Sequence, residues 1–178
     1  MTALSPHLSQ RCRSIRLLLL DVDGVLTDGN LIYGAEGEAL KAFNVRDGLG
    51  IRLLMESGIQ VGVVTGRGGP ILDRRCRELG VRLIFDQIKD KQRILTQITA
   101  ANSISPGQIA FVGDDLIDLP LLTRVGLPIA VADAHPEVRR TAAWTTQAAG
   151  GRGAVREVCE GLLEAQDLWT GILETYQS

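Results

Sequence analysis

The sequence of 178 residues predicts an α/β fold, a doubly wound parallel sheet with helices on both of its faces. Apolar runs of strand length alternate with helical stretches along most of the chain. The run Leu17–Leu20 is wholly apolar, which is typical of a strand buried on both faces. Glycine and proline punctuate the ends of the helical stretches. We therefore expect one Rossmann-like domain over residues 1–178, with right-handed crossovers between parallel strands.

Five strands and six helices are expected in this alternation. After Leu17–Leu20, the runs IQVGVV, VRLIF, QIAFVG and PIAVA have the composition of buried strands. The last part of the chain, about residues 153–178, is expected to form a helical tail. The helices are expected at Gly48–Ser57, Pro70–Leu79, Lys91–Ala101, Asp118–Val125, Pro136–Ala142 and Ala154–Gln166.

One segment, about residues 29–46, interrupts the alternation. It holds two short strand-like runs around a glycine-containing turn, which predicts a β-hairpin inserted after the first strand. A hairpin at this place would project over the end of the first strand, either as a flap or as a contact with another subunit. The apolar residues Leu31, Ile32 and Tyr33 favour the subunit contact.

Composition and charge exclude several classes of function. The net charge of -2, with both signs spread along the chain, provides no basic stripe for nucleic acid. Cys12, Cys76 and Cys159 are widely spaced, which fits a reducing compartment and neither a disulfide framework nor a zinc site. No apolar run has the length of a membrane span or the form of a signal core, so we expect a cytoplasmic protein without a membrane partner.

Acidic residues follow two of the predicted strands. Asp21 and Asp23 come directly after the first strand, and Asp114 comes directly after QIAFVG. The carboxyl ends of parallel strands meet at one edge of a sheet, where ligands of open α/β sheets bind. Asp21 and Asp23 are two residues apart, so both lean to one face, and Gly24 allows a tight exit. Mutual repulsion would raise at least one of the two pKa values, so that one ionised aspartate serves as nucleophile and its protonated neighbour as general acid. Asp21, at the end of the strand, is the better candidate for the nucleophile.

Three carboxylates at one edge predict a magnesium site. Mg²⁺ prefers a few carboxylates together with water and substrate phosphate. A single aspartate after a strand more often forms a turn or caps a helix, and that alternative stays open for Asp115 and Asp118. It is weak for Asp21, Asp23 and Asp114 together, because it leaves their gathering against mutual repulsion unexplained.

Thr65 and Lys91 are expected at the same edge. Thr65 ends the strand IQVGVV in the stretch VVTGRG, and Lys91 begins a later helix. Taken alone, Thr65 is more often a helix N-cap and Lys91 a solvated surface lysine, but together a hydroxyl, backbone amides and an ammonium suit a phosphate. A carboxylate about 4 Å from a phosphate dianion is repelled by roughly 8 kcal/mol at an effective dielectric constant of 20. A divalent ion and Lys91 would offset most of this repulsion.

Four of these stretches resemble, in order, the motifs of the haloacid dehalogenase superfamily of phosphatases. They are DVDGVLTDG, VVTGR, Lys91 and GDDLID. The resemblance implies that Asp21 forms an aspartyl-phosphate, that Asp23 protonates the leaving alkoxide and then activates water, and that Thr65 and Lys91 hold the phosphoryl group. It also implies Mg²⁺ bound by Asp21, by the backbone carbonyl of Asp23 and by Asp114.

Three further stretches, GEALKAFNVRDGLGIR, VADAHPEVR and GGRGAVREVCE, are similar to the family of capless 3-deoxy-D-manno-octulosonate 8-phosphate phosphatases. The likeness spans residues 17–165. It implies a magnesium-dependent phosphatase of an acidic sugar phosphate in lipopolysaccharide precursor synthesis, without a cap domain. It further implies a homotetramer with active sites at subunit interfaces. The implied substrate contacts are Asp23, Asn44, Val45, Arg46, Asp47, Gly48, Arg52, Arg67, Arg75 and Lys91.

The sequence departs from that family at two places and leaves other functions open. Asp86 and Gln87 stand where a Gln-Gly pair is expected, and GRGGP is unusually rich in glycine after Arg67. A phosphatase of a nine-carbon acid sugar 9-phosphate would need nearly the same pocket. A receiver domain does not need the acid at Asp23, and a non-catalytic oligomerisation module does not need the complete motif set.

Overall fold

The computed structural model describes residues 4–88, 91–102 and 104–177, and it confirms the doubly wound parallel sheet. All neighbouring strands of the main sheet pair in parallel. The strand order is β5-β4-β1-β6-β7-β8. The bounds are β1 Leu17–Leu20, β4 Gln60–Val64, β5 Leu83–Phe85, β6 Ile109–Gly113, β7 Leu127–Ala130 and β8 Trp144–Thr145.

Strand β1 lies at the centre of this sheet. Leu17 is in register with Gln60 of β4 on one side and with Ile109 of β6 on the other. All four residues of β1 are completely buried, and all five residues of β6 are buried. Burial of this much apolar surface on both faces makes the centre of the sheet a rigid base for the loops that follow it.

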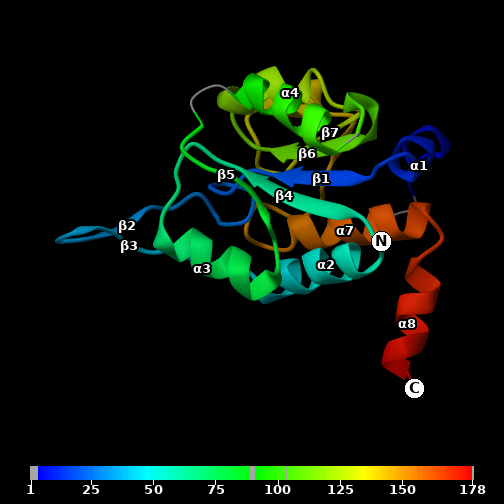
Figure 1. Cartoon of the computed structure of the whole chain (residues 1–178), viewed down its shortest axis with the longest axis horizontal. Coiled ribbons are helices and arrows are strands. Elements are labelled where there is room, and N and C mark those ends of the chain that lie inside the picture. The colour runs from blue at the N-terminus through cyan, green and yellow to red at the C-terminus, as the bar shows by residue number, and fades with distance from the viewer. Residues whose placement is uncertain (1–3, 89–90, 103, 178) are drawn as a thin grey trace.

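Helices cover both faces of the sheet (Figure 1). α2, α3 and α7 lie below the sheet in this view, and α4 lies above it with α5 and α6 packed alongside. Near the end of the chain, α8 extends away from the body. The bounds are α1 Pro6–Arg13, α2 Val45–Glu56, α3 Pro70–Leu79, α4 Lys91–Asn102, α5 Leu119–Leu122, α6 Pro136–Thr141, α7 Ala154–Ala165 and α8 Trp169–Gln177, with 3-10 turns η1 Pro106–Gln108 and η2 Leu116–Asp118.

The hairpin predicted after the first strand is present. β2 (Ile32–Gly34) and β3 (Gly37–Leu40) pair antiparallel and form a separate two-stranded sheet. The hairpin projects from the end of the body at which β1 and β4 terminate, opposite the end that carries α8 (Figure 1). In the described part of the chain this small hairpin is the whole insertion between β1 and α2, so no cap domain is present there.

Three local expectations differ from the structure. α2 begins at Val45 instead of Gly48, because the Asn44 side chain accepts a hydrogen bond from the Arg46 amide at 2.8 Å and caps the helix. The helix expected over Asp118–Val125 is wrong as one element, since the chain forms η2 and then the short α5. Strand β8 and helix α1 were not expected.

The described helices include none that is both long enough and apolar enough to span a bilayer.

Candidate active site

The site is built where the direction of strand connection reverses. From β1 the chain moves outward through β4 and β5, and it then returns to the other side of β1 with β6. Asp21 follows β1 and Asp114 follows β6, so adjacent central strands deliver both acids to one edge. The Asp21 amide donates to the Val112 carbonyl at 3.1 Å, which continues the pairing of β1 with β6 past the last strand residue. This crevice is the usual ligand site of a doubly wound sheet.

Three carboxylates converge in the crevice. Ligand oxygens of Asp21, Asp114 and Asp118 all lie within 4.8 Å of one another. Asp118 is completely buried, and its Oδ2 accepts hydrogen bonds from the amides of Asp114 (2.9 Å) and Asp115 (3.3 Å). Asp118 therefore holds the loop after β6 in its turn and also adds a third carboxylate to the cluster. The sequence alone did not decide between a structural role and a place in the cluster for this residue. Asp115 caps η2 through its bond from the Leu116 amide.

Two glycines make room for these carboxylates. Gly24 has φ +93°, and a Cβ at this position would overlap the Asp114 carboxylate. A Cβ at Gly113 would likewise collide with the Asp118 carboxylate. The backbone is thus shaped around the acids, and the oxygen-only donor set with hard carboxylate ligands fits Mg²⁺.

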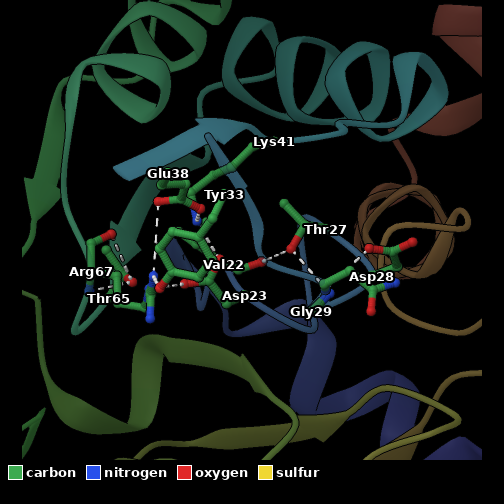
Figure 2. Close-up of polar contacts among 11 residues, drawn as sticks. Val22, Asp23, Thr27, Asp28, Gly29, Tyr33, Glu38, Lys41, Thr65 and Arg67 are labelled. Carbon is green, nitrogen blue, oxygen red and sulfur yellow. Dashed lines mark hydrogen bonds and ion pairs between the residues drawn. The ribbon is translucent and has the colours of Figure 1, made fainter. Parts of the chain in front are cut away.

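Asp23 lies beside the hairpin, and its partner Lys41 is a side chain that sequence reasoning did not single out. Its Oδ1 pairs with Nζ of Lys41, and its Oδ2 lies 3.7 Å from Nε of Arg67. Lys41 is also 3.0 Å from Glu38 Oε1. Figure 2 shows Tyr33 and Glu38 of the hairpin, and Lys41 just past it, gathered above Asp23. The register of the hairpin turns these polar residues toward the acids, and no local motif marks that orientation.

Thr65 and Arg67 belong to the turn between β4 and α3. Thr65 is buried, and its Oγ1 accepts a hydrogen bond from the Arg67 amide at 3.1 Å. The Arg67 guanidinium donates to the Tyr33 hydroxyl at 3.2 Å. That bond, and then the charges of Asp23 and Glu38, raise the pKa of Arg67, which stays a permanent cation. Lys91 is the first residue of α4, and its side chain lies outside the described part of the structure.

The expected substrate contacts at the start of α2 divide into exposed and buried groups. Val45 and Arg46 are exposed and line a surface hollow with Asn44 and Arg152. Asp47 is 1% exposed, and its Oδ1 accepts from the Arg156 amide of α7 at 2.7 Å. Burial raises the pKa of Asp47, against a smaller opposing effect of these backbone bonds. The Asp47 carboxylate is thus hydrogen-bonded to the backbone of α7.

The remaining arginines of the expected set have different surroundings. Arg75 of α3 packs closely over Gly48, lies 5.7 Å from the centroid of the Phe43 ring and donates to the Asn44 carbonyl at 3.4 Å. It thereby ties α3 to the start of α2. Arg52 instead faces solvent and lies 3.9 Å from Glu56, so the structure does not bring it to the acids.

The two departures from the family pattern meet in space. A Cβ at Gly68 would overlap the Asp86 carboxylate, so the extra glycine leaves room for the unexpected acid. Gln87 has φ +53°, a left-handed conformation that favours the glycine expected there. Gln87 thus holds a backbone conformation that glycine would adopt without strain.

Comparisons with known proteins agree with this geometry. A family model described as haloacid dehalogenase-like hydrolase matches residues 80–157. The chain is 49% identical over 162 residues to the 3-deoxy-D-manno-octulosonate 8-phosphate phosphatase of Salmonella typhimurium, covering 91% of this chain and 86% of that protein. The crystal structure of the phosphatase of that name from Yersinia pestis superposes with a TM-score of 0.92 at 47% identity, covering 94% of this chain and 91% of that one.

A third relative was crystallised with ligands. The 3-deoxy-D-manno-octulosonate 8-phosphate phosphatase of Moraxella catarrhalis, in complex with a magnesium ion, a phosphate ion and a KDO molecule, superposes with a TM-score of 0.94. The two sequences are 39% identical, and the match covers 97% of this chain and 99% of that one.

Proposed function

Since the chain belongs to the haloacid dehalogenase-like hydrolases, and among them to the 3-deoxy-D-manno-octulosonate 8-phosphate phosphatases, we propose that it releases phosphate from that eight-carbon sugar acid. The products are the free sugar acid and inorganic phosphate, in lipopolysaccharide precursor synthesis. The enzyme is a phosphoric monoester hydrolase. The observation that carries the proposal is the convergence of Asp21, Asp114 and Asp118 at the switch point of a sheet shared with these relatives.

The cofactor is Mg²⁺, for which Asp21 and Asp114 provide carboxylate ligands and the Asp23 backbone carbonyl a further oxygen. When bound, the ion offsets the charge on the phosphoryl oxygens that the carboxylates would otherwise repel. Asp118 completes the acidic cluster and holds the loop that carries Asp114. The support is the oxygen-only donor set of this chain and the magnesium ion in the Moraxella catarrhalis complex.

The chemistry follows from the positions of two acids. A carboxylate oxygen of Asp21 attacks phosphorus, the ester bond to the sugar oxygen breaks, and Asp23 gives its proton to the departing alkoxide. Asp23 then takes a proton from a water molecule, whose oxygen attacks the aspartyl-phosphate and restores Asp21. We assign Thr65 and Lys91 to holding the phosphoryl oxygens during both transfers.

The substrate carboxylate requires cationic partners, and Arg67 lies within ion-pair distance of Asp23, with its Nε 3.7 Å from Oδ2. Arginine binds carboxylates with two parallel hydrogen bonds, which suits a sugar acid that carries one. We keep Asn44, Val45, Arg46 and Gly48 as proposed contacts at the start of α2. Asp47, Arg52 and Arg75 complete the proposed set, although their surroundings in this structure support them less directly.

The test is a comparison of substrates. Purified enzyme is assayed for phosphate release with Mg²⁺ and with EDTA, on the eight-carbon 8-phosphate and on a nine-carbon acid sugar 9-phosphate. We expect release only with Mg²⁺ and a kcat/KM at least about tenfold higher for the eight-carbon substrate. Faster turnover of the nine-carbon substrate would mean that the nine-carbon 9-phosphate, and not the eight-carbon 8-phosphate, is the substrate. If neither compound released phosphate, the chain would be a non-catalytic oligomerisation module.

We further propose a homotetramer in which hairpins meet and neighbouring subunits complete the active sites. The support is the apolar hairpin surface, where Ile32 is 45%, Tyr33 62% and Leu40 61% exposed. Apolar residues gathered on one projecting element favour contact with another subunit. Light scattering should report a tetramer for the native chain and smaller species for Ile32→Ser combined with Leu40→Ser. A native monomer would contradict the shared site.

We place the enzyme in the cytoplasm. The three cysteines are free and buried, which suits a reducing compartment. Fractionation of cells with an antibody against the chain tests this placement, and recovery in the membrane or periplasmic fraction would contradict it.

A further inference from the structure

Lys41 is a buried cation that the proposed chemistry does not yet use. It lies just beyond β3, and its side chain is only 3% exposed. Its Nζ pairs with Oδ1 of Asp23 and lies 3.0 Å from Oε1 of Glu38. Burial of a lysine ammonium is costly unless carboxylates compensate it, so two acids hold this side chain in one position.

The four charges around Asp23 form a closed ring. Lys41 joins Asp23 Oδ1 to Glu38 Oε1, and Arg67 joins Glu38 Oε2 at 4.0 Å to Asp23 Oδ2 at 3.7 Å (Figure 2). Signs alternate around the ring, and its net charge is zero. The two cations differ in exposure, since the Arg67 side chain is 43% exposed and that of Lys41 is buried. Lys41 is therefore the fixed member of the ring and Arg67 the accessible one.

The two oxygens of Asp23 are held differently. Oδ1 is paired with Lys41, whereas Oδ2 is buried, lies 3.7 Å from Arg67 Nε and has no hydrogen-bond partner among the described residues. We propose that Lys41 is a positioning residue that fixes the Asp23 carboxylate through Oδ1, so that Oδ2 is the oxygen that exchanges the proton with the leaving group and with water. This inference rests on the proposed function of Asp23, and it assigns to the hairpin a part in the chemistry besides subunit contact.

Glu38 has a matching part. Its carboxylate is the second acidic partner of Lys41. It holds the ammonium between the two carboxylates, so that Nζ neither shifts closer to Asp23 nor turns toward solvent. Both residues belong to the hairpin region, while Asp23 follows β1. The distance between the hairpin and the sheet edge therefore sets the position of the Asp23 carboxylate. A misplacement of about 1 Å in a catalytic group can cost on the order of 10²-fold in rate.

The experiment compares two leaving groups in Lys41→Met. The alkoxide of the sugar phosphate needs a proton from Asp23, whereas the p-nitrophenolate of p-nitrophenyl phosphate leaves without one. We expect kcat for the sugar phosphate to fall about 10²-fold with KM within about threefold of the native value. With p-nitrophenyl phosphate, the first transfer should persist and hydrolysis of the aspartyl-phosphate should slow. The variant should therefore release a rapid burst of nitrophenol, up to one per active site, before a slow steady state.

Other variants separate positioning from folding. Lys41→Arg keeps the cation and should recover kcat to within about tenfold of the native value. Arg13→Met removes the distant ion pair with Asp167 and should leave the kcat for both substrates unchanged. If Lys41→Met loses the native circular dichroism spectrum, Glu38→Gln combined with Lys41→Met removes one charge of each sign and is tested in the same way.

The proposal is overturned if the folded Lys41 variant keeps its native kcat, or if burst and steady state slow equally. If the native enzyme hydrolyses p-nitrophenyl phosphate but not the sugar phosphate, only the proposed substrate is wrong. The role of Lys41 can then still be tested by the nitrophenol burst of the Lys41→Met variant. A native enzyme inactive on both would overturn the phosphatase function itself.

Discussion

The acidic edge of the sheet and the hairpin meet at Asp23 but are built in opposite ways. The edge rests on β1 and β6, two strands whose residues are buried and which pair with a neighbouring strand on both sides. The hairpin is a separate two-stranded sheet whose strand residues are nearly all exposed. The edge supplies groups that must not move, and the hairpin supplies groups that act through Asp23. Changes at the edge should therefore have the largest effects, and changes in its surroundings should only modulate it.

The largest effect is expected from Asp21→Asn. The amide cannot serve as the nucleophile, so kcat should fall on the order of 10⁴-fold or more while the fold is kept. Phosphate release with Mg²⁺ measures the loss, and thermal unfolding checks the fold. Asp167→Asn, at an exposed pair far along the chain, is the matched control. Equal loss in the control would show that the assay reports stability.

Metal binding should stabilise the edge. Three carboxylates within 4.8 Å repel one another, and a cation bound only by the folded state relieves that repulsion. At a Mg²⁺ concentration of about 100 times its Kd, folding gains about 2.7 kcal/mol, or roughly 5 to 10 °C in Tm. Calorimetry should show this rise in the native chain and little of it in Asp114→Asn. A rise of equal size in that variant would place the ion elsewhere.

The loop between β4 and α3 should show a smaller, coupled effect. Gly68→Ala should destabilise the native chain through overlap with the Asp86 carboxylate, and much less so in Asp86→Ala. A double-mutant cycle by urea unfolding should give a coupling of about 1 kcal/mol. Additive effects would mean that the two departures from the family pattern are independent.

Asp47 should show the smallest effect, since it is buried like the edge acids but outside their cluster. Its pKa is raised above the ordinary 3.8, mainly by burial, so the folded state binds more protons than the unfolded state just above that pH. Stability should therefore fall as pH rises from about 3.8, and Asp47→Asn should lack this fall. Asn keeps the acceptor for the Arg156 amide, so the variant should match or exceed native stability at pH 7, by less than about 1 kcal/mol. Urea unfolding of the native chain and of the variant at pH 4 and pH 7 measures how the stability of each changes with pH. A variant clearly less stable than the native chain at pH 7 would contradict the expected role of Asp47.

Sequence reasoning succeeded where one local pattern controls the structure. The buried run Leu17–Leu20 and the proline and glycine that bound α3 predicted their elements directly. It failed where a distant partner decides. The two residues of β8 form a strand because they pair with β7, and the loop after β6 turns because the Asp118 side chain folds back onto it.

The same division holds within the site. Asp21 and Asp114 were predictable, because strand ends in a parallel sheet share an edge. Lys41 and Glu38 were not, because their approach to Asp23 depends on the angle at which the hairpin leaves the body. Their residue types alone resemble those of an ordinary exposed hairpin.

The most direct test of the central claim is chemical capture of the phosphorylated residue. Asp23→Asn is mixed with Mg²⁺ and p-nitrophenyl phosphate, quenched, reduced with borohydride and analysed by peptide mass spectrometry. Because the aryl group leaves without a proton while hydrolysis needs Asp23, the aspartyl-phosphate should accumulate and appear as homoserine at position 21. An unmodified Asp21 in enzyme that has released nitrophenol, or a modification at another residue, would contradict the assignment of Asp21 as the nucleophile.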